Sequence, residues 1–267
     1  MGDLITMDDL TNEEILQVLD NARSLLPVAK GDVYLPLLQG KVLGNLFFEN
    51  STRTRMSFET AMKRLGGEVL NLSSIGSSVA KGETLYDTMQ MVDGYADIAV
   101  IRHPNQGAAQ YSADAVEIPI LNGGDGAGNH PTQTMLDLFT IREAHGSLEG
   151  LNVMMVGDLR YGRTTHSLSH ALVRFGAKIT LVSPESLRMP DEIVSDLISH
   201  GGEINETEEM SLSIDSADVI YMTRIQKERF PDEDEYIKVA GIYKLTEDDL
   251  SGAKAGMIVM HPLPRVN

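Results

Sequence analysis

The chain has 267 residues, 42% of them hydrophobic, no cysteine and a net charge of −17 at pH 7. The absence of cysteine excludes disulfides, thiolate metal sites and a cysteine nucleophile. The acidic balance argues against nucleic acid or an anionic membrane as a partner, because either needs a spread basic face. No apolar run is long enough to span a membrane, and "MGDLITMDDL" lacks a signal-peptide pattern, so we expect a cytoplasmic protein. Any anionic ligand must then be held by local cations.

The first half of the chain alternates helices with strands. Thr11 and Glu14 form a capping box before an apolar stripe, which predicts a helix over 11–26. A β-α-β unit follows, in which "RMSFETAMKRLGG" is a helix closed by glycine, and Pro131 begins a helix that runs to about Ala144. The strands predicted in this half are 41–48, 68–72, 96–101 and 116–121.

The second half repeats the alternation. The predicted strands are 151–157, 178–182, 218–222 and 256–260, and the predicted helices are 164–175 and 191–199. This pattern predicts an α/β fold with two domains, each a parallel sheet flanked by helices, the second Rossmann-like. We expect the first domain over 1–130, a connecting helix over 131–145 and the second domain over 146–267.

Polar and cationic side chains gather after the predicted strands. They lie in 51–55, 102–103, 122–133, 158–164, 223–226 and 261–265. Ligands of open parallel sheets bind beyond the carboxyl ends of the strands, so these segments are candidates for one site.

Each candidate also has a structural interpretation. The cluster from Ser51 to Thr54 offers hydroxyls, backbone N–H groups and a guanidinium to a phosphate, but a helix cap beside surface arginines explains it equally well. A single histidine such as His130 is more often structural, Lys81 fits a solvated loop, and arginines such as Arg163 commonly form surface ion pairs. The glycine pattern matches neither a Walker loop nor a dinucleotide-binding turn, which argues against a nucleotide hydrolase and a dehydrogenase.

Taken together, the motifs resemble those of aspartate carbamoyltransferase catalytic chains over essentially the whole sequence. They are "FFENSTRTR", "KGETLYDT", "RHP", "NGGDG" leading to "HPTQT", "VGDLRYGRT", "YMTRIQKERF" and "HPLPR", in that family's order. The combination is specific, because separate structural explanations would all have to hold at once.

The resemblance implies transfer of a carbamoyl group from carbamoyl phosphate to the amine of L-aspartate in pyrimidine biosynthesis, without cofactor, metal or covalent intermediate. It assigns carbamoyl phosphate to Ser51, Thr52, Arg53, Thr54, Arg102, His130, Gln133, Leu263 and Pro264. The catalytic residues among these would be Arg53, Thr54, Arg102 and His130, and the aspartate ligands Lys81, Arg163, Arg224 and Gln226. Ser77 and Lys81 would enter a neighbouring subunit's site, which implies a homotrimer whose substrates close the two domains. Binding of a separate regulatory chain stays open.

Two alternatives fit part of the sequence. An ornithine-type enzyme shares the phosphate half, but typically carries a His-Cys-Leu-Pro motif, where this chain has "HPLP" and two arginines suited to a dicarboxylate. A non-catalytic paralogue that binds a partner would have broken ligand positions, and none is found. The family's C-terminal helices do not follow "HPLPRV" in this sequence, and the start before the first helix is slightly shorter.

Overall fold

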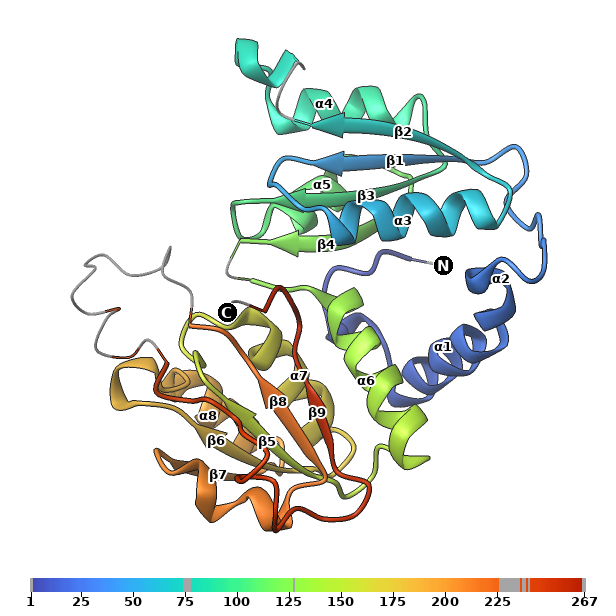
Figure 1. Cartoon of the computed structure of the whole chain (residues 1–267). Coiled ribbons are helices and arrows are strands. Elements are labelled where there is room, and N and C mark those ends of the chain that lie inside the picture. Colours follow the sequence, from blue (N-terminus) through green and yellow to red (C-terminus); the bar gives the residue numbers. More distant parts are fainter. Residues whose placement is uncertain are drawn as a thin grey trace. The chain divides into compact units, whose positions relative to one another are not determined.

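The computed structural model describes residues 2–73, 78–126, 128–225, 236, 239 and 241–265. The chain divides into two compact units, Met1–Met135 and Leu136–Asn267, which we describe one at a time. Each unit contains one parallel sheet flanked by helices (Figure 1). The predicted α/β fold class is confirmed.

The first unit opens with helices whose ends the sequence specifies. Thr11 caps α1 (Asn12–Ser24) through the predicted capping box. The Thr11 hydroxyl accepts from the Glu14 N–H, and the Glu14 carboxylate accepts from the Thr11 N–H. A short helix α2 (Leu26–Lys30) follows and ends at Gly31, whose φ of 85° favours glycine.

The first sheet has the strand order β2-β1-β3-β4, and all its pairs are parallel. Its strands are β1 (Val42–Phe47), β2 (Glu68–Ser73), β3 (Ile98–His103) and β4 (Ile120–Asp125). Its helices are α3 (Arg53–Arg64), α4 (Leu85–Asp93) and α5 (Ala108–Ala115). Strand-helix crossovers of this kind bring the carboxyl ends of the strands to one edge of the sheet.

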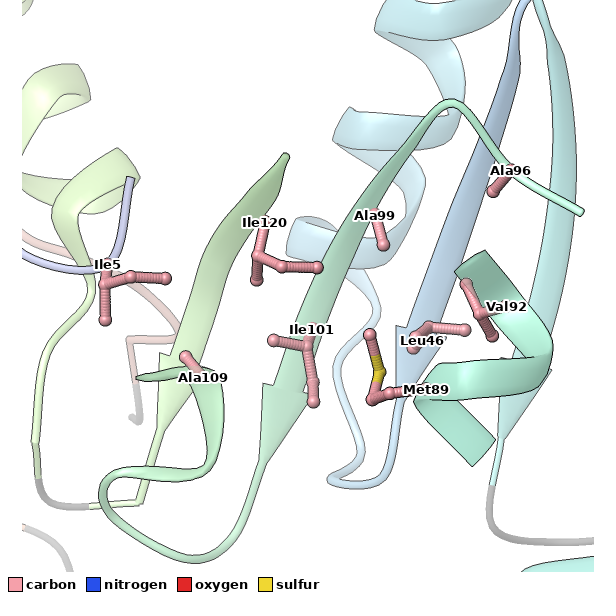
Figure 2. Packing of buried hydrophobic residues seen from close by; sticks show 9 residues of the cluster. All are labelled: Ile5, Leu46, Met89, Val92, Ala96, Ala99, Ile101, Ala109 and Ile120. Atoms are coloured by element: carbon pink, nitrogen blue, oxygen red, sulfur yellow. The ribbon is translucent and has the colours of Figure 1, made fainter. Parts of the chain in front are cut away.

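Both faces of this sheet are covered. On one face, Met89 and Val92 of α4 lie over Leu46 and Ile101 of the central strands (Figure 2). On the opposite face, Met62 of α3 joins a separate cluster with side chains from β1 and β3. Residues that alternate along a strand therefore pack against different helices, as a sheet buried on both sides requires.

The N-terminal segment forms an additional contact at the β4 edge. Leu4 bridges Leu121 in parallel, and its N–H donates to the Ile120 carbonyl at 2.9 Å. The Asp3 carboxylate accepts from the Ile120 N–H at 2.8 Å. Ile5 completes the core beside Ile120 (Figure 2).

Strand β4 lies further along the chain than the sequence predicted. The prediction placed it over 116–121, whereas it covers Ile120–Asp125 and includes the polar "NGGD". Asn122 is fully buried, and its side-chain amide is satisfied because it donates to the Ile5 carbonyl at 3.0 Å. Gly123 suits the close approach to β3, since a Cβ there would lie 3.1 Å from Val100. Tertiary contacts thus hold in a strand residues whose local sequence is typical of a loop.

The second unit is built around a five-stranded sheet with the order β7-β6-β5-β8-β9, again parallel throughout. The strands are β5 (Asn152–Val156), β6 (Lys178–Val182), β7 (Glu203–Thr207), β8 (Val219–Met222) and β9 (Ile258–Met260). The helices include α6 (Pro131–His145), which begins in the first unit, α7 (Arg163–Val173) and α8 (Asp191–Ser199). Strand β7 was not predicted, because "EINET" is a polar, largely exposed edge strand without an apolar run.

Among the described helices, none is both long enough and apolar enough to cross a membrane.

Candidate active site

The "STRTR" cluster lies between the carboxyl end of β1 and the start of α3. Thr52 occupies the N-cap position of α3, but its side chain makes no capping hydrogen bond. The N-cap side chain therefore does not satisfy the first-turn N–H groups of this twelve-residue helix. These groups carry the positive end of the helix dipole. A helix N-terminus beside hydroxyls and a guanidinium is a suitable place for a phosphate.

The two arginines of the cluster have different surroundings. Arg53 is exposed and forms no ion pair with a described residue. Arg55 faces Glu59, whose pKa is lowered by hydrogen bonds from Lys63 and Asn71 and, more weakly, by the charge of Arg55. Arg53 is thus the cation left available to an external anion.

Arg102, at the end of β3, is held by two neighbouring strands. Its Nη1 donates to the Gly123 carbonyl of β4 at 3.1 Å, and its Nε lies 3.2 Å from the Glu49 carboxylate that follows β1. Burial lowers the Arg102 pKa, and the charge of Glu49 counteracts this effect. These contacts fix the guanidinium at the same sheet edge as Ser51–Thr54.

His130 precedes α6 and is almost fully buried. Its carbonyl accepts from the backbone N–H of Gln133 at 3.0 Å and of Thr134 at 3.2 Å, so it caps the helix through its main chain. Its ring Nδ1 lies 3.3 Å from the Thr132 hydroxyl. Gln133, in the first turn of α6, is half-buried. Both side chains belong to the segment that leaves β4, the strand next to Arg102.

Asp125, which was not among the predicted site residues, organises this segment. It is 3% exposed, and its carboxylate accepts from the backbone N–H of Asn129 at 2.6 Å and of Gly107 at 2.8 Å. It thereby links the loop leading to His130 to the start of α5. Its place among glycines after a strand was the only sequence signal, whereas Glu49 gave none.

In the second unit, the predicted aspartate-binding arginines follow adjacent strands. Arg163 is the first residue of α7, in the connection after β5, and Arg224 lies two residues beyond β8. The two strands pair in parallel up to Val156 and Met222, so both arginines leave the same edge. Each is half-buried.

The segments carrying these arginines approach each other closely at Gly157. This residue has a φ of 118°, and a Cβ there would lie 2.5 Å from the Thr223 carbonyl oxygen. The Thr223 N–H donates to the Val156 carbonyl at 2.8 Å. Only glycine fits this approach without displacement of the backbone.

The loop between β5 and α7 is held by its own hydrogen bonds. The Asp158 carboxylate accepts from the Tyr161 N–H at 2.9 Å, and His166 Nε2 donates to the Leu159 carbonyl at 2.7 Å. Burial lowers the pKa of His166, which favours the neutral ring. Arg163 is consequently presented by an ordered loop.

Leu263 and Pro264 follow β9, next to β8 in the sheet. Leu263 has a φ of 59°, precedes a cis peptide bond to Pro264, and donates its N–H to His261 Nδ1 at 2.8 Å. Burial, and then the charges of Arg265 and Arg224, lower the His261 pKa. This segment therefore lies within electrostatic reach of Arg224.

The remaining predicted site residues are Lys81, Ser77 and Gln226. Lys81 is exposed at the end of a short 3-10 helix, Ser78–Lys81. Ser77 and Gln226 lie outside the described residues. In the part of the chain that the structure describes, no group of three or more histidines and carboxylates is arranged to hold a metal ion.

Each of the two α/β units has a parallel sheet with arginines beyond the carboxyl ends of its strands. This arrangement defines an α/β enzyme suited to anionic substrates. Two family models match the chain: the carbamoyl-P binding domain of aspartate/ornithine carbamoyltransferase over residues 2–143, and the Asp/Orn binding domain over 149–267. The chain belongs to the aspartate/ornithine carbamoyltransferase family.

Relatives within this family carry a more specific name. The aspartate carbamoyltransferase catalytic subunit of Archaeoglobus fulgidus is 53% identical, with 100% of this chain and 88% of the relative covered. That of Methanococcoides burtonii is 55% identical over 99% of this chain and 86% of its own length.

Solved structures agree. The catalytic subunit of M. jannaschii aspartate transcarbamoylase has a TM-score of 0.91 at 50% identity, covering 100% of this chain and 87% of that one. Aspartate transcarbamoylase from Trypanosoma cruzi, in complex with carbamoyl phosphate and aspartate, has a TM-score of 0.93 at 39% identity, covering 99% and 86%.

Proposed function

We propose that this chain transfers the carbamoyl group of carbamoyl phosphate to the amine of L-aspartate, giving N-carbamoyl-L-aspartate and phosphate for pyrimidine biosynthesis. The observation that carries this proposal is the uncapped start of α3 at the same sheet edge as the anchored Arg102. Relatives named aspartate carbamoyltransferase catalytic subunit, 53% and 55% identical over 100% and 99% of this chain, support it.

Carbamoyl phosphate is bound by the first unit in this proposal. Ser51, Thr52 and Thr54 supply hydroxyls and backbone N–H groups, and Arg53 pairs with the phosphate as a bidentate donor. Arginine suits this role because its planar fork matches two phosphate oxygens, which a lysine does not.

The reaction needs positive charge at two places. The neutral aspartate amine attacks the planar carbonyl carbon, and negative charge grows on the carbonyl oxygen. The bond from carbon to the phosphate oxygen then breaks, and the amine loses one proton to the departing phosphate. Thr54, Arg102 and His130 face the carbonyl oxygen, and Arg53 stabilises the leaving phosphate. Groups held in place before the reaction lower the barrier without reorganising, and Glu49 and Gly123 hold Arg102 in this way.

The carbamoyl amide requires hydrogen-bond partners of its own. Gln133 at the start of α6 and the backbone around Leu263 and Pro264 orient the NH₂ group. The left-handed conformation of Leu263 sets the direction of these carbonyls, and such backbone persists only where its surroundings hold it.

Aspartate is bound by the second unit, with help from a neighbouring subunit. Arg163, Arg224 and Gln226 receive its two carboxylates. Ser77 and Lys81 of an adjacent copy reach into the site, so the active form is a homotrimer. The exposure of Lys81 supports a role outside its own unit.

An acceptor screen tests the proposed reaction directly. The purified chain is incubated with carbamoyl phosphate and L-aspartate, L-ornithine or no amino acid, and both phosphate and carbamoylated product are measured. We expect product with aspartate alone. Product with ornithine instead would assign the chain to the other branch of the family, and no product with either would support a non-catalytic paralogue.

A further inference from the structure

A buried tyrosine hydroxyl connects three elements of the second unit. Tyr221 of β8 is fully buried, and its hydroxyl donates to the Asp137 carboxylate of α6 at 2.9 Å, with Asp137 only 5% exposed. The same hydroxyl is hydrogen-bonded to the Thr164 side chain at the start of α7. Asp137, Tyr221 and Thr164 thus form one chain of hydrogen bonds.

Packing alone does not explain these polar groups. Val219 and Ile220, which precede Tyr221 in β8, are fully buried apolar residues. A phenylalanine would fill the tyrosine's place without bringing a hydroxyl into the core, and burying a carboxylate is costly unless it is hydrogen-bonded. Burial, followed by the charge of Asp137, raises the Tyr221 pKa well above its ordinary value, so the hydroxyl keeps its proton and remains a donor.

The position of the chain of hydrogen bonds points to its role. Thr164 directly follows Arg163, and Tyr221 precedes Arg224 by three residues in β8 and its extension. The hydroxyl therefore ties together the two segments that carry the arginines. The close approach at Gly157 fixes their backbones on the strand side, and the hydrogen bonds fix the first turn of α7.

We infer that Tyr221 is a positioning residue, which through Thr164 and Asp137 sets the spacing between Arg163 and Arg224 and thereby the affinity for the dicarboxylate acceptor. The inference rests on the proposed binding of aspartate by these two arginines. Tyr221 itself need not touch the substrate. Loss of its hydroxyl should weaken aspartate binding and leave the phosphate half unaffected.

The test is the Tyr221→Phe substitution in the full chain. We expect the KM for aspartate to rise about three- to tenfold, the range for one lost net hydrogen bond, with the KM for carbamoyl phosphate changed less than about twofold. Tyr243→Phe is the matched control, since it removes a hydroxyl that donates to the Glu208 carbonyl at 3.0 Å in the same unit. That variant should keep both KM values.

A second pair of variants covers the case in which Tyr221→Phe fails to fold. Thr164→Val removes the hydroxyl at nearly constant shape, whereas Thr164→Ser retains it. We expect Thr164→Val to raise the KM for aspartate but not the KM for carbamoyl phosphate. Thr164→Ser should keep both KM values close to those of the unsubstituted chain. All assays are run well below the melting temperature measured for each variant by circular dichroism.

Failure of the inference is distinguishable from failure of the proposed function. If the unsubstituted chain carbamoylates aspartate but Tyr221→Phe changes neither KM, or raises both equally, the positioning role is wrong and the function stands. If the unsubstituted chain does not use aspartate, the proposed function fails first, and the inference fails with it.

Discussion

Arg53 and Arg55 are separated by one residue, yet only Arg53 lacks a counter-charge among the described residues. We predict that Arg53→Ala lowers kcat about 10²- to 10³-fold, the loss typical of one preorganised donor to developing charge. Arg55→Ala is the matched control and should lower kcat less than about fivefold. Steady-state assays of carbamoyl-aspartate formation measure both, and similar losses in the two variants would contradict the assignment.

His166 gives the stability of the second unit a defined pH dependence. Burial lowers its pKa in the folded chain, so below about pH 6.5 the unfolded chain takes up a proton that the folded chain does not. Its contribution is therefore complete above about pH 6.5 and is lost as the pH falls towards the folded pKa.

We predict that the free energy of unfolding falls as the pH is lowered from about 6.5, with a slope from this group of at most about 1.4 kcal/mol per pH unit. Urea unfolding at several pH values measures it. The curve of His166→Gln should be flatter over this range. An unaltered slope in His166→Gln would count against the assignment.

The ends of β5 and β8 form the scaffold of the aspartate half. We predict that Gly157→Ala destabilises the chain by more than about 1 kcal/mol and also raises the KM for aspartate, because the added methyl group displaces the Thr223 backbone. Gly176→Ala is the control: φ is also positive there, at 69°, but no atom lies within 4 Å of the added Cβ.

Gly176→Ala should therefore destabilise by about 1 kcal/mol without affecting KM. Denaturant unfolding and aspartate titrations separate strain from displacement of the site. An unchanged KM in Gly157→Ala would show that the arginines do not depend on this approach.

The sequence predicted those elements whose signals are local. Buried parallel strands read as continuous apolar runs, so β5 and β6 were placed within a residue of their ends, and the capping box marked the start of α1. Strand β7 and the "NGGD" part of β4 escaped prediction because neighbouring strands, not local propensity, hold them.

The candidate site divides in the same way. The ligand residues have recognisable types at strand ends, and the family resemblance named them. Their supporting groups were not predictable, because the roles of Glu49 and Asp125 depend on which donors the fold brings to each carboxylate. Asp137 and Tyr221 also meet across 84 residues of sequence, which no local pattern encodes.

In the proposed trimer, each site needs residues from two chains, and this can be tested with mixed trimers. Lys81→Gln and Arg53→Ala chains should each be nearly inactive, but a mixture refolded together should regain activity at those interfaces that pair an intact Arg53 with an intact Lys81. For random 1:1 trimers this is about one quarter of the sites. Assays of the refolded mixture measure it, and no recovery would argue against a shared site.

The bridge between Leu4 and Leu121 has a consequence for how the first unit is assembled. Asp3 and Ile120 hydrogen-bond across 117 residues of sequence, so the segment made early during synthesis has no partner until β4 emerges. At about 5 to 20 residues per second, the ribosome leaves this segment unpaired for many seconds. This edge should therefore be among the last parts of the unit to form.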